Sequence, residues 1–229
     1  MHKYGQYCPI AKAVEILGDR WTLLIVRDLL TGSHHFNELE RGLPGISRGL
    51  LAERLRRLQR MGLVEKVTGR NGRQNTAYYP TAAGQELQAV INALLVWGAR
   101  WAFAEPDDND LDPLLLMWWM RGRVCSDHLP AQRVVVRFDF TGAKSQTYWL
   151  LLTPEDASIC LTNPGFELDV LVTADLAAYF QIWLGRLTFT AAQAAGKVQI
   201  DTIPIYANAF PHWFAYSLAA PAVQAALPA

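Results

Sequence analysis

The stretch that decides the fold runs from Gly45 to Thr81 and reads GISRGLLAERLRRLQRMGLVEKVTGRNGRQNTAYYPT. Ser47 is of a type that caps the start of a helix, and apolar residues recur after it at helical spacing. The apolar positions are Leu51, Leu55 and Leu58, and the basic positions on other sides are Arg56, Arg57 and Arg60. We predict a helix with an apolar inner face and a cationic outer face.

A hairpin is expected directly after this helix. Beyond Gly62, the runs Leu63–Val67 and Thr76–Tyr79 have the composition of strands, and the segment between them, GRNGRQN, is turn-forming. A helix of major-groove size followed by a basic hairpin is typical of a winged helix-turn-helix that binds duplex DNA.

The charge of the chain is divided between its two halves, although the total is zero. Residues 1–104 hold 14 Lys and Arg against 8 Asp and Glu, which gives +6, whereas residues 105–229 hold 7 against 13, which gives −6. Residues 41–73 alone carry nine basic and two acidic side chains. Arginines on a helix often form only a solvated face, but this concentration over helix and hairpin favours a polyanionic partner.

Composition places the chain among globular proteins. With 229 residues, of which 51% are hydrophobic and 18% charged, it is long enough for two domains that fold without a metal or a disulfide. The three widely spaced cysteines and the absence of a signal peptide predict a reducing cytoplasm. Apolar runs such as Leu114–Met120 fall far short of the ~20 residues that span a bilayer, so no membrane partner is expected.

The residues before the arginine-rich helix complete the motif. Apolar positions from Pro9 to Leu30 indicate a helix or helix pair interrupted at Gly18-Asp19. A short helix from Phe36 is expected next, and it ends at the break Gly42-Leu-Pro-Gly45. Helix, tight break, helix and hairpin follow in the required order.

The motifs of residues 4–104 resemble those of HxlR-type winged-helix regulators. The resemblance rests on Cys8-Pro9, Gly18-Asp19-Arg20-Trp21, Phe36-Asn37-Glu38-Leu39, Ile46-Ser47, the Leu55, Leu58, Gly62-Leu63-Val64 spacing, Tyr78 to Gly84, and Trp97-Gly98. It implies a dimeric bacterial transcription regulator, expected to be a repressor. It also implies that the long helix expected over 81–104 pairs with the first helix of the other subunit, which fits an apolar face too wide for one small domain to cover.

Contacts with duplex DNA are assigned by position on the helix and hairpin. Residues near the helix start and along its outer face are expected at base edges, namely Ser47, Arg48, Gly49, Glu53 and Arg56. Arg57 and Arg60 are expected at phosphates, and Arg70, Asn71 and Arg73 are expected to reach the backbone or the minor groove from the hairpin. His35 and Phe36 are further phosphate candidates. The family usually has Lys or Arg where this chain has His34-His35, which makes that contact weaker or pH-dependent.

A second domain is expected at 105–229, after an acidic, proline-bounded segment from Glu105 to Pro113. An apolar helix over 114–120 is followed by strands over 133–140, 147–152, 157–161 and 168–173, which we interpret as an antiparallel meander. Asp175 is expected to cap a helix, and further short helices and a strand over 197–201 follow. The fold class is therefore α+β: a winged helix-turn-helix and an antiparallel sheet covered by helices.

Residues 111–217 are similar to sterol-carrier-protein type 2 domains in the acidic cap, the Trp183-Leu-Gly-Arg186 break and the strand Gly196-Lys-Val-Gln-Ile. This resemblance implies an apolar tunnel and an apolar small-molecule effector. The candidate pocket residues are Trp118, Phe180, Trp183, Leu184, Phe210 and Trp213, although aromatic residues at these spacings are also typical of a filled core. The alternatives to effector sensing are a lipid carrier tethered to DNA and a domain that serves only dimer stability.

Chemical activity is not expected. No nucleophile, phosphate-binding or metal-ligand motif occurs, and His34-His35 has no further ligands at suitable spacing, so we predict no enzyme, no metal and no cofactor. Cys8 precedes a helix N-terminus, where the dipole favours a reactive thiolate, and is a redox candidate. The competing interpretation is a small buried residue at the dimer seam.

Overall fold

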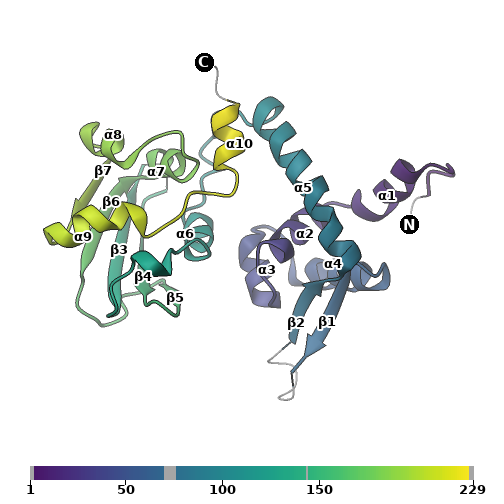
Figure 1. Cartoon of the computed structure of the whole chain (residues 1–229), viewed down its shortest axis with the longest axis horizontal. Coiled ribbons are helices and arrows are strands. Elements are labelled where there is room, and N and C mark those ends of the chain that lie inside the picture. The colour runs from purple at the N-terminus through teal and green to yellow at the C-terminus, as the bar shows by residue number, and fades with distance from the viewer. Residues whose placement is uncertain (1–2, 70–75, 143, 227–229) are drawn as a thin grey trace. The chain divides into compact units, whose positions relative to one another are not determined.

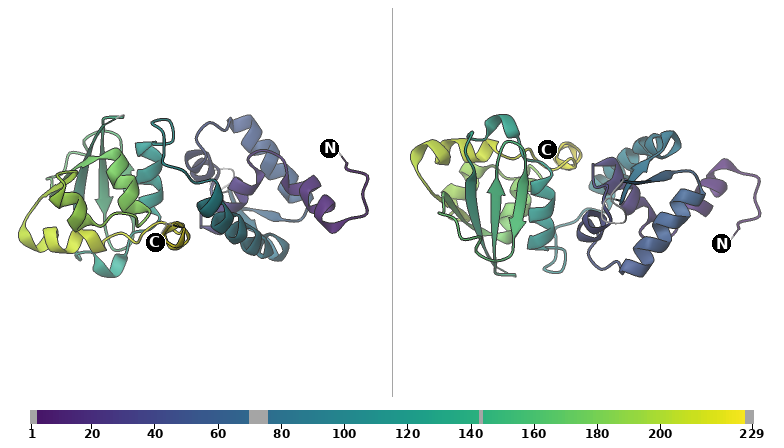
Figure 2. Two further views of the ribbon diagram at one scale, coloured as in Figure 1. Left: turned by 90° about the horizontal axis from the view of Figure 1, so that it is seen from above. Right: turned by 90° about the horizontal axis from the view of Figure 1, so that it is seen from below.

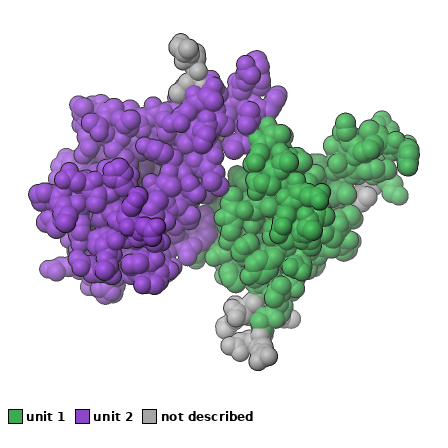
Figure 3. All heavy atoms as spheres, in the orientation of Figure 1, with its two compact units in different colours: residues 1–94 green, residues 95–229 purple. Residues whose placement is uncertain are grey.

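The structure is a computed structural model that describes residues 3–69, 76–142 and 144–226. The chain divides into two compact units, residues 1–94 and residues 95–229 (Figure 3). The division falls inside the long helix α5, Ala82–Trp101. The domain boundary expected after residue 104 therefore stays a prediction.

Unit 1 has the expected order of helices and hairpin (Figure 1). Its elements are α1 (Pro9–Leu17), α2 (Thr22–Leu30), α3 (Phe36–Gly42), α4 (Arg48–Arg60), β1 (Val64–Thr68), β2 (Thr76–Pro80) and the first part of α5. The apolar run expected as a helix or a helix pair is a pair, because the chain turns at Gly18. Strands β1 and β2 are antiparallel, with Glu65 opposite Tyr79.

The core of unit 1 lies between α2, α3 and α4. Leu51, Leu55 and Leu58 of α4 are at most 1% exposed, which confirms the apolar face predicted for this helix. They pack with Ile25 and Leu39 in one buried cluster. Burying a leucine side chain contributes roughly 1.5–3 kcal/mol, so this contact fixes which side of α4 faces outward.

A buried carboxylate lies beside this core, on α2. Asp28 is 5% exposed and accepts a hydrogen bond of 2.8 Å from Nε of Arg27. Its other oxygen has no hydrogen-bond partner among the described residues. Burial raises the pKa of Asp28 above its ordinary value of 3.8, against a smaller lowering by Arg27.

This carboxylate should make stability depend on pH. Because the folded-state pKa of Asp28 is raised, the stability present below about pH 3.8 is lost as the pH rises through that pKa. Asp28→Asn cannot ionise, so the free energy of unfolding of the variant minus that of the wild type should increase from pH 4 upward and then level off. Urea unfolding at a series of pH values measures this difference; a difference that stays constant with pH would contradict the assignment.

Unit 2 contains a sheet and short helices. Its helices are α6 (Pro113–Arg121), η2 (Ser126–His128), α7 (Leu176–Trp183), α8 (Phe189–Ala194), α9 (Pro204–Ala209), η3 (Phe210–His212) and α10 (Ala220–Ala225). Its strands are β3 (Val134–Thr141), β4 (Gln146–Leu152), β5 (Ala157–Cys160), β6 (Val170–Asp175) and β7 (Val198–Asp201). Asp112 and Asp175 cap α6 and α7, as short polar side chains at these positions do.

The sheet is mixed, which corrects the antiparallel meander predicted from the sequence. The strand order is β5-β4-β3-β6-β7, and β3 pairs with β6 in parallel, with Val136 opposite Val170. The chain returns after β5 to the end of the sheet where β3 begins, so β6 runs in the same direction as β3. The alternation within each strand does not encode this long-range pairing.

One face of the sheet is covered by helices, as the two views of Figure 2 show. Side chains such as Val136, Phe138, Leu150 and Val172 point to that face and are fully buried with residues of α6, α7 and η3. The other face is mostly half-buried, but Val135 on that face is only 2% exposed. The α+β class is confirmed, and the described helices include none long and apolar enough to cross a membrane.

Candidate nucleic-acid interface

Helix α4 presents a polar face that its packing leaves outside. Ser47 Oγ accepts a hydrogen bond of 3.2 Å from the backbone N–H of Leu50, which confirms the predicted cap. Because the leucine face is buried, the residues one half-turn away are exposed. They are Gly49, Glu53, Arg56 and Arg60, which recur at helical spacing.

Two of these residues are unneutralised cations. Arg56 and Arg60 form no ion pair within the described part of the chain. Burial raises the pKa of the Tyr78 phenol on β2, and the nearby charge of Arg56 lowers it by a smaller amount. Lys66 on β1 is also exposed and is paired directly with Tyr78 in the hairpin. Both the outer face of α4 and the hairpin therefore carry exposed positive charge.

The start of α4 is held to α3. Arg48 pairs with Glu40, and its guanidinium lies 4.9 Å from the ring centre of Phe36. The Arg48 side chain remains 64% exposed. Phe36 itself packs against the core of unit 1, so its ring anchors α3.

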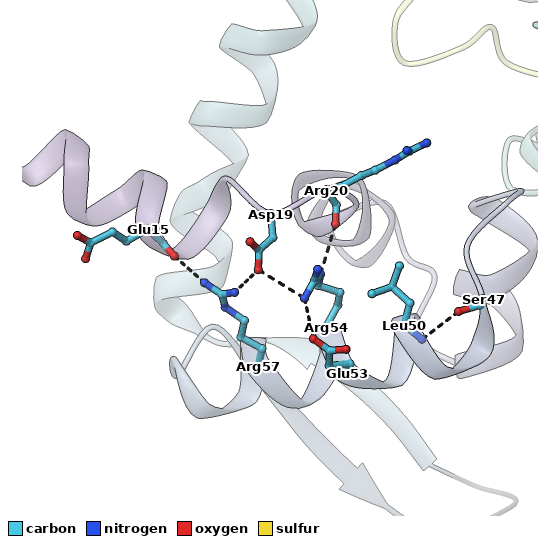
Figure 4. A network of polar contacts seen from close by, with 8 residues as sticks. All are labelled: Glu15, Asp19, Arg20, Ser47, Leu50, Glu53, Arg54 and Arg57. Atoms are coloured by element: carbon cyan, nitrogen blue, oxygen red, sulfur yellow. Dashed lines mark hydrogen bonds and ion pairs between the residues drawn. The ribbon is translucent and has the colours of Figure 1, made fainter. Parts of the chain in front are cut away.

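Arg57 does not face outward, which argues against the phosphate contact predicted for it. Its guanidinium pairs with Asp19 and donates a 2.6 Å hydrogen bond to the carbonyl of Glu15 (Figure 4). The side chain is only 16% exposed. Arg54 lies beside it, 3.4 Å from the same Asp19 oxygen and 3.0 Å from Glu53. The four arginines of α4 after its first turn therefore divide into an inner pair, Arg54 and Arg57, and an outer pair, Arg56 and Arg60.

The adjacent histidines connect α3 to β2. Nδ1 of His34 lies 3.1 Å from the carbonyl oxygen of Tyr78, and Nδ1 of His35 lies 3.1 Å from that of Thr76. A carbonyl only accepts, so each Nδ1 carries a proton. The Glu38 carboxylate accepts the backbone N–H groups of both histidines, each at 3.0 Å. The described residues include no cluster of ligand-type side chains suited to a metal ion.

The assigned residues on the hairpin tip, Arg70, Asn71 and Arg73, lie outside the described residues. Of the other assigned positions, the structure brings Gly49, Glu53, Arg56 and Arg60 to one exposed side of α4, whereas Arg48 is exposed at the helix start beside α3. The Asp19 network is not predicted by the sequence, although Asp19 belongs to the Gly18-Asp19-Arg20-Trp21 motif. The available signal was an acidic residue in a turn and two arginines, Arg54 and Arg57, at a three-residue spacing.

Two apolar stripes lie outside the core of unit 1. On α5, Val90, Leu94, Trp97 and Trp101 recur at spacings of three and four and are 40–68% exposed. On and before α1, Tyr7, Ile10 and Val14 are exposed in the same pattern. Cys8 is the N-cap residue directly before α1 and is half-buried, and the nearby Lys12 is paired with Glu15 at 3.1 Å instead of with the thiol.

Five of the six predicted ligand-pocket residues of unit 2 belong to its core or pack against it. Phe210 and Trp213 are fully buried, with ring centres 5.4 Å apart, and Phe180 and Trp183 are 7% and 6% exposed. Leu184 packs against the same cluster. Trp118 is half-buried beneath the Arg121 guanidinium, 5.0 Å from its ring centre. Phe180, Trp183, Phe210 and Trp213 fill the space between sheet and helices, so the filled-core interpretation fits them better than a pocket.

A surface pocket of about 370 Å³ lies elsewhere in unit 2. It is lined by residues from the start of α6, the β3–β4 connection, β4 and the end of β5: Asp112, Pro113, Leu114, Lys144, Gln146, Thr147, Tyr148 and Leu161. Charged and polar side chains make up much of this lining. It therefore does not have the apolar character expected of a lipid tunnel.

Comparison with known proteins agrees with this geometry. The family model described as HxlR-like helix-turn-helix matches residues 16–106. The HTH-type regulator YvaP of Bacillus subtilis is 36% identical over 98 residues, which are 42% of this chain and 91% of YvaP. The chain belongs to the HxlR-like helix-turn-helix family.

Two further relatives also match part of the chain. The regulator YodB of B. subtilis is 35% identical over 103 residues, 44% of this chain and 90% of YodB. An uncharacterized HTH-type transcriptional regulator of Mycobacterium tuberculosis is 40% identical over 89 residues, 39% of this chain and 56% of the relative. The matched part of this family member thus spans about half the length of the mycobacterial relative, and the family match ends at residue 106.

Proposed function

We propose that the chain is a DNA-binding transcriptional regulator in which α4 is the recognition helix. The observation that carries this proposal is the outer face of α4, where Arg56 and Arg60 stand exposed without carboxylate partners in the described structure. A major groove admits a helix of this kind, with side chains near its start at the base edges. The relatives are named HTH-type transcriptional regulators, which supports the same activity here.

We further propose that the active species is a homodimer and that it represses transcription. The exposed stripes of α1 and α5 are the surfaces that a second copy would cover, because a monomer in water seldom leaves such rows of tryptophan and aliphatic residues open. We also propose that the boundary between the two domains lies between residues 104 and 105. The second domain is proposed to be sterol-carrier-like, and the location cytoplasmic.

Selection of duplexes from a random 30-base-pair library is the test. The full chain should enrich a pseudo-palindromic sequence, and its affinity for that sequence should exceed its affinity for a scrambled duplex by a factor of about 10³ or more. Equal affinity for both duplexes would contradict a sequence-reading regulator.

Effector binding and the redox role of Cys8 are separate proposals. Native mass spectrometry of the purified chain tests for a co-purified apolar compound, whose removal should change DNA affinity.

For Cys8, peroxide treatment should change DNA affinity when mass spectrometry shows that this thiol has been oxidised. Unchanged affinity with Cys8 modified would leave the half-buried thiol with a packing role alone.

A further inference from the structure

We propose that Asp19 is a positioning residue that holds the recognition helix α4 to the turn between α1 and α2, through the inner arginine pair Arg54 and Arg57. In consequence, a displacement of α1 is passed to α4. This inference rests on the proposed DNA-binding function, which it deepens: Arg57 affects DNA binding through Asp19 and not by touching a phosphate.

The geometry joins α4 to both sides of the turn (Figure 4). One oxygen of Asp19 lies between the two guanidinium groups, paired with Arg57 and 3.4 Å from Arg54. Arg57 also donates to the carbonyl of Glu15, in the last turn of α1. Arg54 donates to the carbonyl of Arg20 just before α2, at 3.4 Å. These contacts form a polar bracket of Glu15, Asp19, Arg20, Arg54 and Arg57.

The bracket is enclosed enough to matter energetically. The side chains of Arg54 and Arg57 are each 16% exposed. Nε of Arg57 is buried without a hydrogen-bond partner in the described residues. Removing the Asp19 charge would leave a poorly hydrated guanidinium without compensation, which is costly. The Glu15 carbonyl adds to the attraction, because cations are favoured at the C-terminal end of a helix.

The turn that carries Asp19 has a constrained backbone. Trp21, the N-cap residue directly before α2, has a φ of 78°. Among the described non-glycine residues, it alone has a left-handed conformation. This conformation disfavours side-chain-bearing residues and persists where surrounding contacts hold it. The Arg54 bond to the neighbouring Arg20 carbonyl is such a contact. The bracket therefore attaches α4 to a turn of defined shape.

Helix α1 depends on this bracket because it lies outside the apolar core. No residue of α1 belongs to the described buried cluster of unit 1, and Ile10 and Val14 are 75% and 41% exposed. Hydrogen bonds and ion pairs constrain direction as well as distance. A partner that docks on the exposed face of α1 would thus shift the turn, and the bracket would rotate or translate α4 with it.

The experiment uses the full chain and the duplex enriched in the library selection. The variants are Asp19→Asn, Arg57→Gln and the double variant, and the matched control is Arg60→Gln, three residues further along α4 on its outer face. Anisotropy titrations at several salt concentrations give the affinity and its salt slope. Thermal unfolding confirms that every variant is folded at the temperature of the titration.

We expect Asp19→Asn and Arg57→Gln each to weaken binding about fivefold or more without changing the salt slope. The double variant should weaken binding by less than the product of the two single effects, since both changes break the same Asp19–Arg57 contact. Arg60→Gln should instead reduce the slope by about 0.9 per subunit. A reduced slope in Arg57→Gln would make Arg57 a phosphate contact, and wild-type affinity in Asp19→Asn would remove its positioning role; either result overturns the proposal.

A measurement without DNA separates the bracket from the proposed function. Hydrogen exchange followed by mass spectrometry should show faster exchange in α1 and in α4 for Asp19→Asn and Arg57→Gln, but not for Arg60→Gln. Unchanged exchange in α1 would overturn the bracket. If the wild type bound no duplex at all, the proposed function would fail, and the exchange result alone would decide whether Asp19 holds α4.

Discussion

Trp97→Glu should convert the proposed homodimer to a monomer and reduce its affinity for the selected duplex by about 10²-fold or more. Trp97 is 60% exposed in the middle of the α5 stripe, so a single chain tolerates a charge there. A second copy packed on this stripe would have to bury the carboxylate without a partner, which is strongly unfavourable. A monomer also loses the gain in affinity from binding two half-sites at once.

Light scattering coupled to size-exclusion chromatography measures the mass, and anisotropy measures the affinity. The matched control is Gln88→Glu, on the same helix at an exposed position where the side chain bonds Asn92 at 2.9 Å. This control should remain dimeric. If Trp97→Glu kept the mass of a dimer, α5 would not form the seam.

The second large effect is expected when the outer arginine pair, Arg56 and Arg60, is changed. Arg56→Gln should cost about 1–3 kcal/mol for duplexes with the preferred base at one position and little for others, if Arg56 reads a guanine edge. Arg60→Gln should weaken binding to all duplexes and flatten the salt slope, because the contact proposed for Arg60 is with a phosphate. Combining the two should reduce affinity by the product of both factors, since they act on different DNA groups.

Titrations against a panel of single-base variants of the duplex, each at two salt concentrations, distinguish these roles. Lys197→Gln removes the same charge from an exposed position in unit 2 and serves as the control. It should leave affinity and slope unchanged. Identical behaviour of Arg56→Gln and Arg60→Gln across the panel would refute the division into a base-reading and a phosphate-binding arginine.

Local features of unit 1 were predictable because their signals are local. The Ser47 cap, the buried face through Leu51, Leu55 and Leu58, and the hairpin strands each follow from residues close in sequence. The inward direction of Arg57, in contrast, does not follow from residues close to it in sequence. Successive helical residues differ by about 100° around the axis, so Arg57 lies at the border of the buried face. Only the position of the α1–α2 turn decides that Asp19 covers it.

Unit 2 shows two further limits of sequence reasoning. The parallel pairing of β3 with β6 depends on where the chain returns after β5, and no alternation pattern specifies it. The aromatic residues of α7 and η3 were compatible with a pocket or a core, since both environments are apolar. Their mutual packing, as between Phe138 and Phe210 with ring centres 6.1 Å apart, shows that they fill the interior.

Site-specific photo-crosslinking tests the central claim, that the outer face of α4 enters the DNA groove. A benzophenone amino acid in place of Glu53, on the exposed side of α4, should capture the labelled duplex on irradiation. The same group in place of Gln88, exposed on α5, should not. Capture from position 88 but not from position 53 would contradict the assignment of α4 as the recognition helix.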